Sequence, residues 1–254
     1  MRPPRVEVIG VTGIPIVKPG DDVPRLIVEA AERQGTPIQD GDIVVVSHII
    51  VSRAEGRIVN LNAVKPSKFA ENIAKTLGKD PRLVEVILQE SRSIVRMGNG
   101  HLITETKHGF VCANSGVDQS NVPGEGFVAL LPEDPDESAR RIRDGIEKLT
   151  GKRVAVVVSD THGRPLRDGE INVAIGVSGL KPIRDRRGER DLFGYVLKVK
   201  RTAVADEIAS AAELVVGQAD EGVPVAIVRG YRFEWSEEAT ARELIMPRER
   251  DLFV

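Results

Sequence analysis

Two short apolar runs, each leading to an aspartate, constrain the fold of this chain most strongly. Residues 154–158 read Val-Ala-Val-Val-Val and run into Ser159 and Asp160. Residues 110–113 read Phe-Val-Cys-Ala and are followed within five residues by Asp118. Short runs rich in β-branched residues predict buried strands. A carboxylate just beyond such a strand sits on rigid backbone and can hold a divalent cation, so a metal-dependent enzyme is the leading hypothesis.

The rest of the chain predicts strands and helices that do not alternate strictly. Further strands are expected at residues 6–10, 43–50, 94–96, 101–106, 127–131 and 223–229. Helices are expected to start at Asp22, Asp80 and Asp134, to end at Gly78 and Gly151, and to cover 202–216 and 236–246. This order favours an α+β or mixed α/β fold, with mixed sheets and flanking helices, over a doubly wound sheet.

A stretch rich in Gly and Arg, residues 163–200, interrupts this pattern. It predicts a small inserted β-rich lobe at residues 164–202. The main domain would then comprise residues 1–163 and 203–254.

Composition excludes several classes of protein. The formal net charge is −2, so the chain has no general attraction to nucleic acid or membranes, and we expect small-molecule partners. Its single cysteine, Cys112, cannot form an internal disulfide and suits a reducing cytoplasm. No apolar run approaches the roughly 18 residues of a membrane span, and no signal-peptide pattern opens the chain.

Three polar clusters are candidate metal sites. Asn and Asp residues crowd the segment 114–121, although turns also favour these residues. Asp160 and Thr161 offer neighbouring oxygen ligands, with helix capping as the alternative role. Gln218 lies in a polar segment after Gly217, which a helix stop also explains. The four histidines show no zinc-binding spacing, and no P-loop motif is present.

Arginines follow the second aspartate closely. Arg164 and Arg167 are candidates to hold phosphate or substrate carboxylates, because guanidinium groups bind both in a bidentate manner. The denser basic run at 184–190 alternates with acidic residues and is more typical of a solvated loop with ion pairs.

Seven segments in a fixed order resemble the coenzyme F420-0:γ-glutamyl ligase family. They are Gly13-Ile-Pro-Ile-Val17, Val51-Ser-Arg-Ala-Glu-Gly-Arg57, Ser115-Gly-Val-Asp-Gln-Ser-Asn121, Asp160-Thr-His-Gly-Arg-Pro-Leu-Arg167, Ala174-Ile-Gly-Val-Ser-Gly179, Val204-Ala-Asp-Glu-Ile-Ala209 and Val225-Ala-Ile-Val-Arg-Gly230. Their order and spacing together are specific, and they cover nearly the whole chain.

The resemblance implies a reaction and its co-substrates. Members add L-glutamate to F420-0 at the expense of GTP, then add further γ-linked glutamates. They are homodimers of mixed α/β fold that use Mg²⁺ or Mn²⁺ and are activated by K⁺. An amide ligase of this kind would activate the carboxylate as an acyl phosphate, which the amine of glutamate then attacks.

The resemblance also implies site residues. Asp118 and Asp160 would bind one divalent metal, and Thr161 and Gln218 a second. The GTP pocket would include Ile14, Pro15, Ile16, Val17, Arg53, Asn121, Val216, Gly217, Ala219, Asp220, Glu221, Gly222 and Val223. Glu170, Asp220 and His162 are each possible general bases.

Three departures from the family pattern bear on specificity. His48-Ile49 replaces a Ser/Thr/Lys pair, Arg53 replaces a lysine, and Gln218 stands where a carboxylate would bind metal more strongly. The alternatives to this ligase are a two-metal phosphohydrolase, a non-catalytic nucleotide-binding protein and a ligase acting on a different acceptor.

Overall fold

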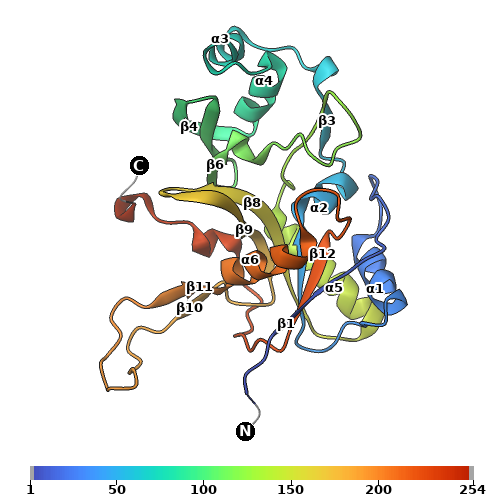
Figure 1. Cartoon of the computed structure of the whole chain (residues 1–254), viewed down its shortest axis with the longest axis vertical. Coiled ribbons are helices and arrows are strands. Elements are labelled where there is room, and N and C mark those ends of the chain that lie inside the picture. Colours follow the sequence, from blue (N-terminus) through green and yellow to red (C-terminus); the bar gives the residue numbers. More distant parts are fainter. Residues whose placement is uncertain (1–2, 252–254) are drawn as a thin grey trace.

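A five-stranded mixed sheet forms the centre of the computed structural model, which describes residues 3–251 (Figure 1). The strand order is β1 (Glu7–Gly10), β12 (Val225–Arg229), β2 (Ile43–Ser47), β8 (Ala155–Arg164) and β9 (Arg167–Ser178). Within this sheet β2 and β8 are parallel, whereas the other neighbouring pairs are antiparallel. The predicted fold class, mixed sheets with flanking helices, is confirmed.

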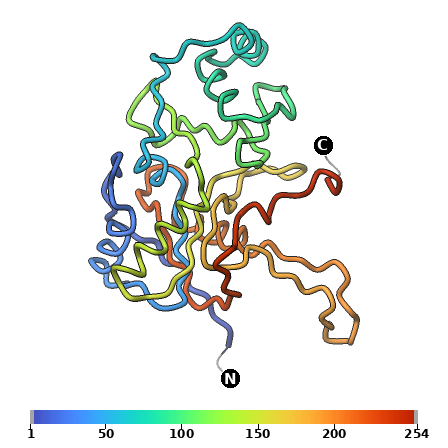
Figure 2. Tube along the Cα trace, turned by 180° about the vertical axis from the view of Figure 1, so that it is seen from behind, coloured from blue at the N-terminus to red at the C-terminus, as the bar shows by residue number. Residues whose placement is uncertain are grey.

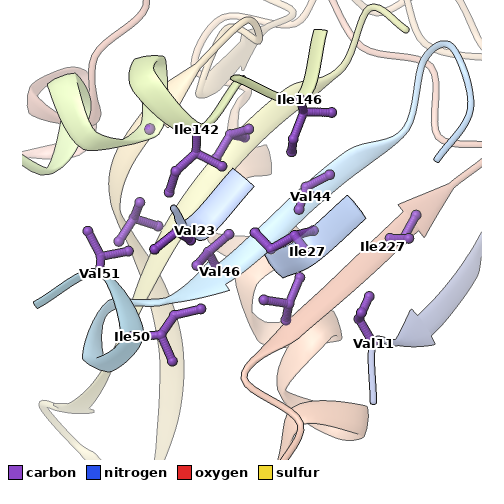
Figure 3. Close-up of a cluster of buried hydrophobic side chains, with 14 of the residues drawn as sticks. Val11, Val23, Ile27, Val44, Val46, Ile50, Val51, Ile142, Ile146 and Ile227 are labelled. Atoms are coloured by element: carbon purple, nitrogen blue, oxygen red, sulfur yellow. The ribbon is translucent and has the colours of Figure 1, made fainter. Parts of the chain in front are cut away.

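The parallel strands β2 and β8 carry continuous apolar runs because both of their faces are buried there. Val44 and Val46 of β2 point into one core, together with Ile27 of α1 (Val23–Arg33) and Ile146 of α5 (Pro135–Thr150) (Figure 3). The alternate residues of the same strands face a second core, which α6 (Val204–Val216) covers with its alanine-rich side. The sheet is therefore sandwiched between helices.

A third core lies beyond one edge of this sandwich, in the upper part of Figure 1. It is built by two helices, a two-stranded sheet and a three-stranded sheet. These elements are α3 (Lys68–Leu77), α4 (Pro81–Gln89), β3 (Ile58–Asn60) paired with β7 (Phe127–Ala129), and β4 (Ser91–Gly98), β5 (His101–Thr106) and β6 (Val111–Ala113). None of the helices among residues 3–251 combines the length and apolar character that a membrane span requires.

The predicted helix ends are confirmed where a capping side chain fixes them. Asp22, Asp80 and Asp134 each accept a backbone hydrogen bond at the start of a helix. Gly78 and Gly151 end α3 and α5 in the left-handed conformation that glycine adopts without strain.

Two predicted elements are wrong. The strand expected at 43–50 ends at Ser47, because α2 (His48–Ala54) begins immediately after it. The helix expected at 236–246 is a short 3₁₀ turn, Ala241–Leu244. The backbone of this segment makes a hydrogen bond to another element, because the amide of Ala241 donates to Oδ1 of Asp136 in α5 at 2.9 Å.

The segment 164–202, expected to form one inserted lobe, divides into two structures. Residues 167–178 form β9 of the central sheet, where Ala174, Ile175 and Val177 are buried. Residues 183–203 form a separate ribbon, in which β10 (Ile183–Asp185) pairs with β11 (Arg201–Ala203). The intervening loop projects away from the body of the molecule (Figures 1 and 2). We call residues 183–203 the arm.

Candidate active site

A cavity of about 600 Å³ lies at the end of β2 and beside residues 159–163 of β8. Because these strands are parallel and Ser47 pairs with Ser159, the residues that follow them, His48 and Asp160, meet at one edge of the sheet. The cavity is lined by residues 14–16, 47–50, 53, 112–114, 116–118, 120–121, 159–163, 170, 172, 216–219 and 221–224. All four predicted metal-ligand residues, Asp118, Asp160, Thr161 and Gln218, are among them.

Asp160 is buried between two imidazoles. Its Oδ2 lies 3.0 Å from Nε2 of His162, its Oδ1 lies 3.3 Å from Nε2 of His48, and Oδ1 also accepts from the amide of Thr161 at 2.8 Å. Burial raises the pKa of the Asp160 carboxyl, but the two histidines and the amide outweigh it and hold that pKa below 3.8. The carboxylate is therefore charged at neutral pH.

His162 forms an ion pair with the Asp160 carboxylate. Burial lowers the pKa of its imidazole, but hydrogen bonds to Asp160 and Cys112 outweigh burial and raise that pKa to about 10. An imidazolium beside Asp160 balances one buried negative charge in the metal-free site.

Thr161 and Gln218 meet across the cavity. The Thr161 hydroxyl lies 2.9 Å from Oε1 of Gln218 and 2.8 Å from Oδ1 of Asn172. Nε2 of Gln218 also donates to Oδ1 of Asn172, at 3.0 Å. The third polar cluster is therefore joined to the second, and Asn172 holds the two together.

Asp118 is placed by a tight left-handed turn. Asn114, Ser115 and Gly116 all have positive φ, at 54°, 54° and 68°. At Gly116 a Cβ would lie 2.7 Å from the Leu131 side chain, so this position requires glycine. The Asp118 carboxylate then accepts from the amide and the hydroxyl of Ser120, both at 2.7 Å.

Most residues expected to contact GTP line the same cavity, but two do not. Val17 is buried in the hydrophobic core, and Asp220 lies outside the cavity lining. Arg53 does line it and donates to the backbone oxygen of Asn121. Burial lowers the pKa of this guanidinium, which nevertheless keeps its charge.

The two predicted catalytic arginines lie at the turn of the β8–β9 hairpin. Arg164 pairs with Arg167 in the strand register, and neither lines the cavity. Nε of Arg164 is buried and has no hydrogen-bond partner within the described residues. Both arginines therefore lie outside the cavity lining.

Two residues that make polar contacts in the cavity, His48 and Asn172, were not predicted from the sequence as site residues. His48 was noted only as a departure from the family pattern, and its signal was its place directly after a parallel strand. Asn172 had no local signal, because only its pairing with Thr161 across the hairpin brings it into the cavity.

The charges of the cavity favour a cationic ligand. Its lining has four carboxylates, from Asp118, Asp160, Glu170 and Glu221, and two cations, the Arg53 guanidinium and the His162 imidazolium. Within residues 3–251, no set of three or more His, Cys, Asp and Glu side chains is arranged to hold a metal ion by itself. One or two carboxylates with neutral oxygens suit Mg²⁺ or Mn²⁺, which complete their shell with water and phosphate.

Comparisons with known proteins agree on one family. The family model described as F420-0:Gamma-glutamyl ligase matches residues 12–230. The chain is 51% identical to the coenzyme F420:L-glutamate ligase of Methanothermobacter thermautotrophicus, over 98% of each chain. It is 50% identical to the enzyme of that name from Methanocaldococcus jannaschii, over 98% of this chain and 97% of the relative. It is 41% identical to the enzyme of that name from Archaeoglobus fulgidus, over 98% of this chain and 96% of the relative.

Proposed function

Because the chain belongs to the F420-0:gamma-glutamyl ligase family, we propose that it joins L-glutamate to the lactyl carboxylate of coenzyme F420-0 through an amide bond. GTP is the co-substrate and is converted to GDP and phosphate. Further glutamates are then added through γ-linkages. Mg²⁺ or Mn²⁺ supports the reaction, and K⁺ activates it.

One observation carries this proposal: the four residues expected for metal and most of those expected for GTP share a single cavity. Asp118 and Asp160 come from different parts of the chain, as do Arg53 and residues 216–219 and 221–223, yet all of them line it. A volume of about 600 Å³ is in the range of small-molecule and cofactor sites.

The oxygen donors fit divalent cations. Asp118 and Asp160 would hold one ion, and Thr161 and Gln218 a second, with the substrate phosphates completing their shells. Bound there, the metal would neutralise phosphate charge and polarise the transferring phosphoryl group. Thr161 and Gln218 are already 2.9 Å apart, so little rearrangement is needed to bring both oxygens to one cation.

The first half of the reaction transfers the γ-phosphoryl group of GTP to the carboxylate and makes an acyl phosphate. Arg53 supplies the guanidinium group in the described cavity lining and would bind phosphate oxygens of GTP. It would thereby stabilise the negative charge that develops on the leaving diphosphate. His48 and His162 hold the Asp160 carboxylate in one orientation, so the donor set is fixed before the substrates arrive.

The second half forms the amide bond. The amine of L-glutamate attacks the acyl phosphate carbonyl, and phosphate leaves. Positioning contributes most here, because holding two reactants together replaces a bimolecular step by an intramolecular one. Asn172, which is hydrogen-bonded to Thr161 and Gln218, supplies polar groups in the cavity that could help to position the substrates.

A homodimer is part of the proposal, and the arm supports it. Leu192 and Phe193 at its tip are 99% and 96% exposed, and Val199 is 87% exposed. Such a row of large apolar side chains on a projecting ribbon is typical of a surface that a protein partner buries. A second copy of this chain is the partner that we propose.

Incubation of the purified protein with F420-0, GTP, Mn²⁺ and L-glutamate tests the proposal, with mass spectrometry of the products. Products heavier by one or more glutamyl units, formed only with GTP and lost with EDTA, are expected. GTP loss without glutamate addition would favour the two-metal phosphohydrolase. The absence of any turnover with F420-0 would contradict the proposal. Two alternatives would then remain, a ligase acting on a different acceptor and a non-catalytic nucleotide-binding protein.

A further inference from the structure

The four carboxylates of the cavity lining differ in the hydrogen bonds that they accept from the rest of the protein. Asp118 accepts from the amide and hydroxyl of Ser120. Asp160 accepts from the amide of Thr161 and contacts two imidazoles. Glu221 accepts from the amide of Ala219 at 2.8 Å. Each of these three is therefore held in place by internal donors.

Glu170 is the exception. Within residues 3–251, no side chain or backbone group donates a hydrogen bond to its carboxylate, although it lines the cavity. Its side chain is also exposed to solvent. A carboxylate that the protein leaves without a donor in its own binding cavity is available to a cationic part of a ligand.

The backbone places Glu170 beside the network that joins the second and third polar clusters. It stands on β9 two residues before Asn172, and side chains two residues apart on a strand share one face. Asn172 pairs with Thr161 across the hairpin. Glu170 and the Thr161–Asn172–Gln218 network therefore face the cavity from the same side of the β8–β9 hairpin.

The other possible bases are less available. Nε2 of His162 is engaged with Asp160. Asp220 lies outside the cavity lining. Of these three residues, Glu170 is the one that lines the cavity and whose carboxylate accepts no hydrogen bond from residues 3–251.

We propose that Glu170 is the catalytic residue that binds the ammonium group of the incoming amino acid and takes its proton. This inference rests on the proposed ligase function. Glu170 accepts one proton from the ammonium, and the neutral amine then attacks the carbonyl carbon of the acyl phosphate. A C–N bond forms and the C–O bond to phosphate breaks, with the electron pair leaving on the phosphate. The second proton of the nitrogen departs with the phosphate to solvent.

The test compares wild type, Glu170→Gln and the control Asp168→Asn with two nucleophiles. Asp168 is on the same strand, two residues away, but does not line the cavity. L-Glutamate must lose a proton before it attacks, whereas hydroxylamine is already neutral near pH 7 and traps an acyl phosphate as a hydroxamate. Glutamyl product and hydroxamate are measured with F420-0, GTP and Mn²⁺.

For Glu170→Gln we expect kcat/KM for L-glutamate to fall about 100-fold or more, the range of general-base contributions. Hydroxamate formation should remain within about 2-fold of wild type, since it needs neither this base nor this ammonium site. Asp168→Asn should match wild type in both assays.

Three outcomes would overturn the assignment. Unchanged kcat/KM for L-glutamate in Glu170→Gln would show that Glu170 is not the base, while the ligase function stands. Equal losses with both nucleophiles would place Glu170 in the phosphoryl step instead. No glutamyl product from the wild-type protein would refute the proposed function itself, and this inference with it.

Discussion

Nε2 of His48 lies 3.3 Å from Oδ1 of Asp160, and this contact joins the end of β2 to its parallel neighbour β8. His48 starts α2 directly after β2, whereas Asp160 continues β8. The parallel register carries both residues to the same edge of the sheet, where open α/β sheets place their ligands. Asp160 is consequently held in the cavity lining, with His162 on its other oxygen.

Asp160→Ala should abolish turnover while leaving the protein folded. The substitution removes the buried carboxylate that we propose as a metal ligand, and the rate should fall roughly 1000-fold or more, since such electrostatic stabilisation amounts to several kcal/mol. GDP release and Mn²⁺ binding measured by electron paramagnetic resonance check this. Asp168→Ala is the control, because Asp168 lies outside the cavity lining. Near-normal GDP release by Asp160→Ala would refute the metal assignment.

His162 should make the metal-free protein less stable at high pH. The folded pKa of about 10 lies above the ordinary value of 6.5. Its stabilising contribution is therefore fully present below about pH 6.5 and is lost as pH rises through about 10. Urea unfolding in EDTA between pH 6 and 10 should show a falling free energy of unfolding for wild type and a flatter profile for His162→Gln. His101→Gln, at an exposed position on β5, should follow wild type. Parallel profiles for wild type and His162→Gln would contradict this.

Local signals in the sequence predicted much of the fold. The β-branched run at 154–158 is a central strand, and the aspartates that cap α1, α4 and α5 mark true helix starts. The failures have tertiary causes. His48-Ile49-Ile50 continues an apolar run and resembles more strand, yet the chain turns there into α2. The segment 236–246 has helical composition, but Asp136 holds its backbone against the sheet.

The site shows the same limit. Asp118 and Asp160 could be singled out because each comes after a short apolar run, and both line the cavity. The positions of His48 and Asn172 depend on which strands are neighbours and in what register, and no single stretch of sequence contains that information. For the same reason the sequence could not show that Arg164 and Arg167 lie at the hairpin turn, outside the cavity lining.

Arg53→Ala should weaken the use of GTP. Arg53 is the only arginine or lysine in the described lining of the cavity, so its removal takes away that positive charge. A hydrogen bond to a charged group contributes about 1.5–3 kcal/mol, and KM for GTP should therefore rise about 10- to 100-fold. Arg53→Lys should recover part of this loss, since lysine keeps the charge but not the bidentate geometry. Steady-state kinetics with varied GTP measure it. An unchanged KM for GTP in Arg53→Ala would exclude Arg53 from the nucleotide site.

Gly176→Ala should destabilise the central sheet against α5. An added Cβ at Gly176 would lie 2.2 Å from the backbone oxygen of Pro135, so the start of α5 would have to move. Overpacking of this kind costs about 1–3 kcal/mol or more. Urea unfolding measures the loss. At Gly98 an added Cβ meets nothing within 4 Å and φ is not positive, so Gly98→Ala is the matched control. Equal unfolding midpoints for the two variants would contradict the contact between β9 and α5.

Phe193→Asp should convert the proposed dimer to a monomer. Phe193 is 96% exposed at the tip of the arm and contributes to none of the described hydrophobic cores, so its substitution leaves the protomer packing intact. A buried aromatic at an interface is a frequent hot spot, and a charge placed there must be desolvated without a partner. Light scattering coupled to size-exclusion chromatography measures the mass, and thermal unfolding of the separated species checks that the protomer stays folded. Phe69→Asp is the matched control, because Phe69 is 59% exposed on α3 and far from the arm in Figure 1. A dimer that survives Phe193→Asp but not Phe69→Asp would move the interface from the arm to the α3–α4 face.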